Sequence, residues 1–131
     1  MTTKNFFIYQ FLLNASFGIG LLLMPQMMVD MYGTDKTPVT GSFEVVARAY
    51  GSLLTVFGIF GWTMRPSEPS LIRYNFFLIT LLAGVLALII HIRAMLQGVE
   101  NSMVWVIILS VGLLTVWSGL LLSKEKTQIS G

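Results

Sequence analysis

The stretch LIRYNFFLITLLAGVLALIIHIRAML, residues 71–96, is apolar along nearly its whole length, and its two arginines, Arg73 and Arg93, lie close to its ends. A helix rises 1.5 Å per residue and needs about 20 apolar residues to cross the hydrocarbon core of a bilayer, so this stretch is long enough to span a membrane. Three further stretches meet the same criterion, at residues 6–24, 43–64 and 103–122. The sequence therefore predicts an all-α integral membrane protein, folded as an antiparallel bundle of four transmembrane helices in a single domain, residues 1–131.

Composition limits the functions that this chain can perform. Of its 131 residues, 55% are hydrophobic and only 11% are charged, which is far from the balance of a soluble globular protein. Cysteine is absent, and this excludes disulfide exchange, thiolate catalysis and cysteine metal sites. No nucleophile with its base, phosphate loop or metal cluster is recognisable in the sequence. We therefore predict no catalytic residue, no bound metal, no cofactor and no nucleic-acid partner.

The basic residues predict the orientation of the four helices. Positive charge gathers on the side of a membrane protein that faces the cytoplasm, and here the side of both termini carries Lys4, Arg65, Arg73, Lys124 and Lys126. Both termini should therefore be cytoplasmic. On the opposite side, residues 26–32 follow Pro25 and precede Gly33. We expect this segment to form a short helix in the outer interface.

Small and polar residues predict which helix faces are buried in protein, because lipid cannot satisfy a polar group and gains nothing from a glycine. Two such stripes occur, one in residues 43–64 and one in residues 71–96. Together they form a predicted packing seam of Gly51, Thr55, Gly58, Thr80, Gly84 and Ala87. Folding the two helices symmetrically about the short RPSEPS turn, residues 65–70, pairs Glu44 with His91, Arg48 with Ala87, Gly51 with Gly84, Thr55 with Thr80, Gly58 with Phe77, and Trp62 with Arg73.

Polar residues near one end of this seam form the candidate functional site. Glu44 and Arg48 lie four positions apart in an otherwise apolar stretch, so their side chains can pair on one helix face. The predicted register brings His91 to them, and Asn14 is the matching polar residue of the first helix. A membrane-embedded ionisable residue is a functional candidate by default. The alternative is a purely structural ion pair at the start of a helix, where the negative charge of Glu44 also interacts favourably with the positive end of the helix dipole.

The order of polar residues along the chain resembles that of two groups of small four-helix membrane proteins. An asparagine in the first helix, an Arg-x-x-Gly at the start of the second and a histidine near the end of the third are present here as Asn14, Arg48 with Gly51, and His91. This pattern resembles proteins of the ergosterol-biosynthesis scaffold type and bacterial four-helix proteins of similar length. The resemblance implies a scaffold or accessory role that tethers membrane enzymes. We therefore predict a non-catalytic accessory or scaffolding subunit that acts through its helix faces, with membrane lipids and other integral membrane subunits as partners, and homo-oligomers stay open.

Two other functions remain open on the sequence alone. One is a lipid- or quinone-binding membrane enzyme whose pocket opens to the outer leaflet and is lined by Asn14, Glu44, Arg48 and His91. The other is a small homo-oligomeric transporter. It is the weakest of the three, because neither a charge at mid-membrane nor a broken helix is evident in the sequence. In every case we expect a multi-pass protein of a bacterial inner membrane.

Overall fold

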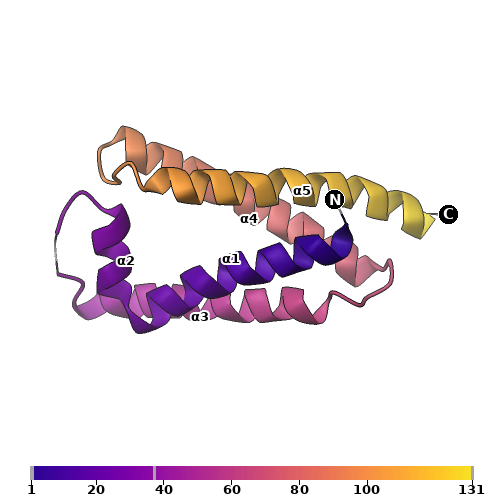
Figure 1. Cartoon of the computed structure of the whole chain (residues 1–131), viewed down its shortest axis with the longest axis horizontal. Helices are drawn as coiled ribbons and strands as arrows, with labels where there is room; N and C mark the ends of the chain where they lie inside the picture. The colour runs from indigo at the N-terminus through magenta and orange to yellow at the C-terminus, as the bar shows by residue number, and fades with distance from the viewer. Residues whose placement is uncertain (1, 37, 131) are drawn as a thin grey trace.

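A computed structural model describes residues 2–36 and 38–130 of the chain. Within these residues the chain forms five helices (Figure 1): α1 (Thr3–Leu23), α2 (Pro25–Tyr32), α3 (Gly41–Thr63), α4 (Leu71–Leu96) and α5 (Val104–Ser130). Helices α1, α3, α4 and α5 are each long and apolar enough to cross a membrane. The predicted all-α bundle of four spanning helices is therefore confirmed.

Helix ends follow the local sequence. The side chain of Thr2 accepts a hydrogen bond from the backbone of Asn5 and so caps α1, and Ser70 caps α4 in the same way. Pro25 begins α2, because proline at the first helical position gives up an N–H that would have no partner there. Gly98, with φ of +71°, follows α4 in the left-handed conformation that favours glycine. Only α5 differs much from its predicted range: it continues through the mainly polar residues 123–130.

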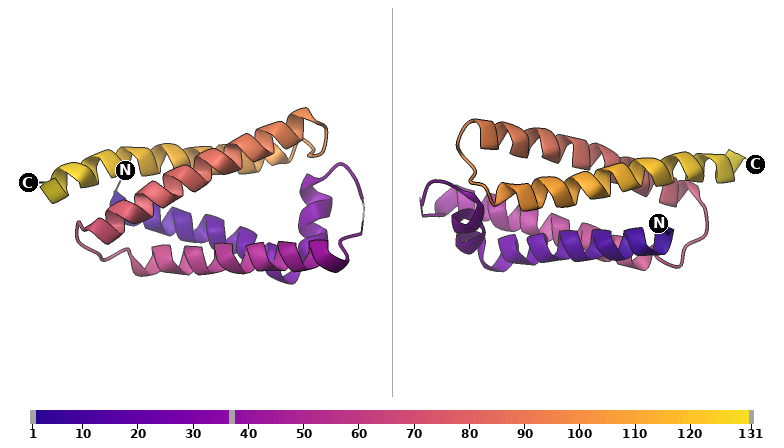
Figure 2. Two further views of the ribbon diagram at one scale, coloured as in Figure 1. Left: turned by 180° about the vertical axis from the view of Figure 1, so that it is seen from behind. Right: turned by 45° about the horizontal axis from the view of Figure 1, so that its top comes forward.

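The helices pack in two antiparallel pairs, α1 with α3 and α4 with α5 (Figure 2). Over the described residues, α3 and α4 make no extended contact, so the predicted α3–α4 seam is wrong. A Cβ built on Gly51 would lie 2.6 Å from Gly18 O of α1, and one on Gly84 would meet the side chain of Thr115 in α5. The glycines do mark close helix contacts. Their spacing cannot show which helix lies opposite.

Aromatic residues hold the two pairs together at the end that carries both termini. The cluster consists of Phe6, Phe7, Phe76, Phe77, Leu114, Trp117 and Leu121. Its rings are in contact across the pairs: the centroid of Phe6 lies 5.2 Å from that of Phe77 and 5.8 Å from that of Trp117, in edge-to-face geometry. Ring pairs of this kind add to the stabilisation that burial provides.

A buried ion pair lies at the same end of the molecule. Arg73 Nε and Nη2 donate to Glu125 Oε1 and Oε2 over 2.8 and 2.6 Å. The remaining contacts are with the α3–α4 connection: Ser70 N donates to Glu125 Oε1, and Arg73 Nη1 donates to Ser67 O. The pair therefore ties the start of α4 to the C-terminal part of α5.

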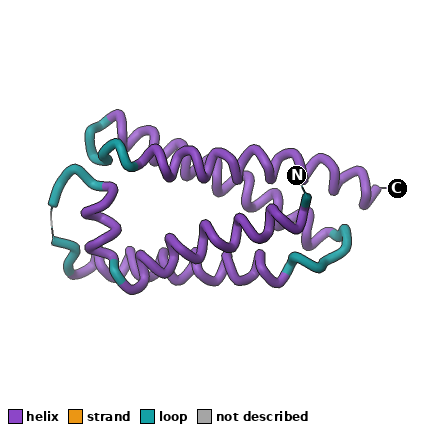
Figure 3. Tube along the Cα trace, in the orientation of Figure 1, coloured by secondary structure: helices purple, strands orange, loops and turns teal. Residues whose placement is uncertain are grey.

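The opposite end is closed by α2, which lies across the ends of the long helices (Figures 1 and 3). Its C-terminus is hydrogen-bonded to the α4–α5 connection, because Asn101 N donates to Tyr32 O over 2.8 Å and Asn101 Nδ2 donates to Met31 O and Gly33 O over 3.0 Å each. Thr34 Oγ1 also donates to Gly98 O over 2.6 Å. The two helix pairs are thus joined at both ends.

Candidate ligand-binding cavity

A cavity of about 510 Å³ lies between the two helix pairs, in the part of the bundle between the aromatic cluster and α2. All four long helices and α2 contribute to its wall, which is mainly aliphatic and aromatic. The lining residues are Leu13, Asn14, Phe17, Leu21, Met28, Val29, Tyr32, Gly33, Phe43, Val46, Ala47, Tyr50, Leu54, Phe57, Thr80, Ala83, Gly84, Ala87, His91, Val99, Glu100, Ile107, Val111 and Leu114. This volume falls within the range of small-molecule sites in proteins.

The wall of this central cavity is closed on one side and open on the other. On the α5 side, Ile107 and Leu114 are 7% and 5% exposed. On the α3 side, Val46 and Tyr50 line the cavity but are still 63% and 51% exposed. Since α3 and α4 do not pack along their length within the described part of the chain, the cavity opens sideways between these two helices. In a bilayer that opening faces lipid.

Polar groups gather at the end of the central cavity next to α2. His91 Nδ1 lies 2.8 Å from Glu100 Oε1 and 3.1 Å from Oε2. A carboxylate only accepts hydrogen bonds, so Nδ1 must carry the proton and Nε2 of a neutral His91 is an acceptor. Nε2 makes no hydrogen bond with any residue that the structure describes. It is available to a ligand.

Tyr32 provides a second polar group at this end. Burial raises the pKa of its hydroxyl above the usual value near 10, so the group keeps its proton at physiological pH and can donate a hydrogen bond. Backbone pairing of Gly33 with Glu100 holds the end of α2 against the loop that carries the carboxylate. The donor and the acceptor are therefore positioned by the same contact.

Asn14 is the polar residue on the α1 wall of the central cavity. Its Nδ2 donates to Gln10 O of its own helix over 2.9 Å, whereas its Oδ1 has no hydrogen-bond partner among the described residues. Thr80, also in the wall, satisfies its hydroxyl within α4 by donating to Phe76 O. Asn14 is thus the one amide in this wall with an acceptor free for a ligand.

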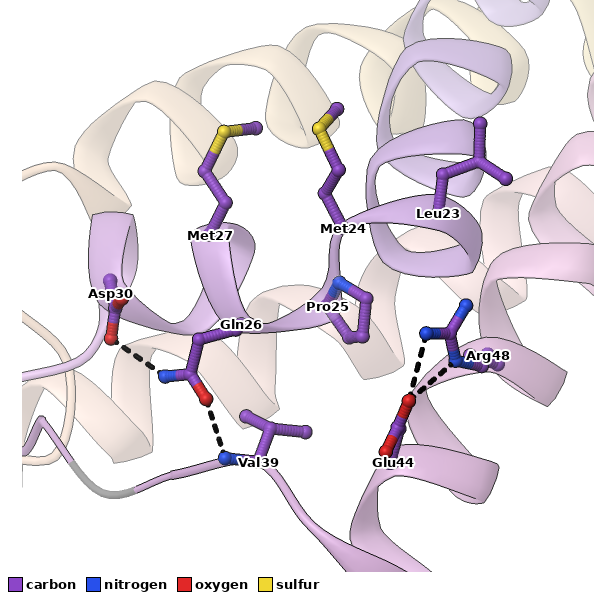
Figure 4. Close-up of a pocket in the computed structure, with 9 residues that line it drawn as sticks. All are labelled: Leu23, Met24, Pro25, Gln26, Met27, Asp30, Val39, Glu44 and Arg48. Atoms are coloured by element: carbon purple, nitrogen blue, oxygen red, sulfur yellow. Dashed lines mark hydrogen bonds and ion pairs between the residues drawn. The ribbon is translucent and has the colours of Figure 1, made fainter.

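Glu44 and Arg48 do not belong to this cavity. They line a separate cleft of about 520 Å³, formed where α1, α2 and α3 meet (Figure 4). Arg48 Nε and Nη2 donate to Glu44 Oε1 over 2.9 and 2.8 Å, and Arg48 Nη1 donates to Leu22 O at the end of α1 over 2.6 Å. The predicted Glu44–Arg48 pair is present. The predicted contact of Glu44 with His91 is wrong, because His91 pairs with Glu100 instead.

The other pairs predicted across α3 and α4 are also wrong, because these residues contact another helix or their own helix, or line the central cavity. A Cβ on Gly58 would lie 3.1 Å from Ala15 N of α1, and Thr55 Oγ1 donates to Gly51 O within α3. Ala87 lines the central cavity and does not contact Arg48. Trp62 does lie under an arginine, as expected, but this arginine is Arg65, 3.1 Å from the ring centroid.

The sequence predicted one site from four residues that the structure divides between two sites, and two further residues of the central cavity were not among them. Asn14 and His91 line the central cavity, whereas Glu44 and Arg48 line the cleft. Glu100 and Tyr32 were not predicted. The signal for Glu100 was weak but present: it is an acidic residue in the short connection after a helix that carries the chain's only histidine, His91, near its end.

No group of three or more His, Cys, Asp or Glu residues is arranged to hold a metal ion in residues 2–36 and 38–130. Compared with known proteins, the chain matches no family model, no curated protein and no solved structure.

Proposed function

We propose that this protein binds one lipophilic molecule with a small polar head in the central cavity. The observation that carries the proposal is the cavity itself: about 510 Å³ between two helix pairs that are joined at both ends, with apolar walls and polar groups at one end. An accessory subunit that acts only through its outer helix faces needs no internal cavity. The geometry therefore favours the lipid- or quinone-binding alternative over the scaffolding role that the sequence resemblance implies.

The polar end suggests the chemistry of the head. In a neutral His91 whose Nδ1 donates to Glu100, Nε2 can accept a hydrogen bond, and the Tyr32 hydroxyl can donate one. A hydroxyl can satisfy both, because it is donor and acceptor at once. The tail then extends past Ala87 toward Leu13 and Leu114, in the direction of the aromatic cluster. The ligand class is thus a lipid alcohol or a quinol, entering sideways from the bilayer between α3 and α4.

Binding is the whole of this proposal. We further propose that the end with both termini faces the cytoplasm of a bacterial inner membrane. The basic residues near that end support this orientation. The His91–Glu100 end of the cavity then lies toward the outer leaflet.

Two alanines on nearly opposite faces of α3 provide a matched test. Ala47 lines the central cavity, whereas Ala49 is exposed and lies outside it. The protein is purified in a mild detergent, and the lipids that remain bound are identified by native mass spectrometry followed by extraction. Ala47→Phe should remove a tightly bound lipophilic molecule that both wild type and Ala49→Phe retain. Absence of any such molecule from wild type, or its equal retention in both variants, contradicts the proposal.

A further inference from the structure

The cleft at the junction of α1, α2 and α3 is distinct from the central cavity. Its nine described lining residues are Leu23, Met24, Pro25, Gln26, Met27, Asp30, Val39, Glu44 and Arg48, and none of them also lines the central cavity. It lies where one spanning helix ends and the next begins. At the ends of spanning helices the surrounding solvent is the layer of lipid headgroups.

Glu44 and Arg48 form a fixed pair of opposite charges at one end of this cleft (Figure 4). Both bonds that Arg48 makes to Glu44 go to Oε1, so Glu44 Oε2 has no hydrogen-bond partner in the described chain. Arginine has five N–H groups, and three of those of Arg48 are used. Two N–H donors and one carboxylate oxygen therefore remain side by side, open to a ligand.

This arrangement is complementary to a zwitterion with a phosphate and a primary ammonium. The phosphate accepts from the free N–H groups of Arg48, and arginine suits phosphate well. The ammonium donates to Glu44 Oε2. The apolar side chains of Leu23, Met24 and Met27 provide a surface for the first part of an acyl chain.

Two further features select among headgroups. At the other end of the cleft Asp30 accepts from Gln26 Nε2 over 2.9 Å, which gives the cleft two carboxylates against one guanidinium. An anionic headgroup without an ammonium is therefore disfavoured. Quaternary ammonium groups are recognised by aromatic rings, and none of the lining residues described above is aromatic. A choline headgroup has no N–H to donate, so it also fits less well.

We propose that the Glu44–Arg48 cleft is a binding site for the headgroup of an ethanolamine phospholipid. This site does not depend on the function proposed for the central cavity. It also gives the exposed charge pair a role beyond the structure of α3.

Native mass spectrometry of the full chain with phospholipids of identical acyl chains tests the proposal. We expect the ethanolamine lipid to bind roughly tenfold more tightly than the choline or glycerol lipid, the ratio typical of one hydrogen bond to a charged group. The N-methyl and N,N-dimethyl ethanolamine lipids should fall in between, in the order of their remaining N–H groups. Equal binding of the ethanolamine and choline lipids overturns the proposal.

Three variants assign the selectivity to the cleft. Glu44→Gln keeps the shape of the side chain. In this variant the ethanolamine and choline lipids should bind with affinities within about twofold of each other, as expected when one charge-assisted hydrogen bond is lost. Asp30→Asn should raise the affinity for the glycerol lipid, because it removes one of the two carboxylates of the cleft. Glu68→Gln, which removes an exposed carboxylate in the α3–α4 connection, should change nothing. Gel filtration and melting curves confirm that each variant is folded, and a full ethanolamine preference in both Glu44→Gln and Asp30→Asn overturns the proposal.

The Ala47→Phe variant separates this proposal from the preceding one. It fills the central cavity and leaves the cleft intact, so it should keep the ethanolamine preference of wild type. If Ala47→Phe abolishes that preference while Glu44→Gln preserves it, the lipid occupies the central cavity and the cleft is not its site.

Discussion

Arg73 of α4 and Glu125 of α5 form a two-pronged ion pair, 2.8 and 2.6 Å long, with side chains only 9% and 3% exposed. Each partner also bonds to the backbone of residues 64–70. Breaking a buried pair leaves one charge without compensation, which costs about 3–5 kcal/mol. Glu125→Gln should therefore lower the free energy of unfolding in detergent by about that amount.

The exposed Glu44–Arg48 pair is the matched comparison for this prediction. Its side chains are 39% and 43% exposed, and exposed ion pairs contribute about 0–1 kcal/mol. Glu44→Gln should therefore change the melting curve far less than Glu125→Gln does. Equal losses would mean that Glu125 is as well solvated as Glu44, against the burial described above.

Close helix contact between α1 and α3 predicts different costs for two glycines. A Cβ on Gly51 would lie 2.6 Å from the backbone atoms Gly18 O and Leu22 N, which cannot move away as the end of a flexible side chain could. Gly51→Ala must push α1 and α3 apart, so we expect a loss of about 1–3 kcal/mol in the free energy of unfolding.

Gly112 of α5 is the control, because a Cβ there would meet no atom within 4 Å. Gly112→Ala should be neutral or slightly stabilising, since alanine has the higher helix propensity. Thermal unfolding of both variants in the same detergent measures the difference. Indistinguishable melting temperatures would contradict the tight α1–α3 contact.

Four spanning helices predict the location of two reporter fusions. Both chain ends lie at the same end of the bundle (Figure 1), and residues 34–36 follow α2 at the other. A reporter fused after the last residue should be active on the cytoplasmic side, and one inserted at residues 34–36 on the opposite side. Activity of both reporters on one side would rule out the three spans, α3, α4 and α5, that the fold places between them.

The four spans could be predicted from the sequence because length and hydrophobicity alone decide whether a helix can cross a bilayer. Helix pairing could not. Gly51 and Gly84 were correctly predicted to lie at close helix contacts. A glycine allows any helix to approach closely, however, so it does not identify the neighbour, which is Gly18 for Gly51 and Thr115 for Gly84. The α3–α4 connection was taken to force its helices together, whereas it allows them to diverge and leaves room for the central cavity.

The candidate site was predictable in part for a related reason. Pairing of Glu44 with Arg48 is local, four positions apart on one helix, and helix geometry requires no knowledge of the fold. The contact of Arg73 with Glu125 joins residues 52 positions apart, and that of Asn101 with Tyr32 joins two helix pairs. Contacts of this kind depend on the tertiary arrangement, which no periodicity in the sequence encodes.

The polar end of the central cavity leads to a last prediction, on how the ligand is held. Tyr32 donates and His91 accepts in the proposed complex, so Tyr32→Phe removes one hydrogen bond and keeps the ring that lines the cavity. We expect roughly tenfold weaker retention of the co-purified molecule, as the loss of one buried hydrogen bond implies. Glu100→Gln should have a similar effect. An amide can donate to His91 Nδ1 as well as accept from it, so the Nδ1 proton is no longer required and the acceptor at Nε2 is lost in part of the molecules.

Tyr74→Phe, which removes a hydroxyl outside the cavity, is the control. Retention is measured by native mass spectrometry during stepwise activation of the complex. Unchanged retention in both Tyr32→Phe and Glu100→Gln, with loss in Ala47→Phe, would mean that the ligand is held by its tail alone and carries no head at this end.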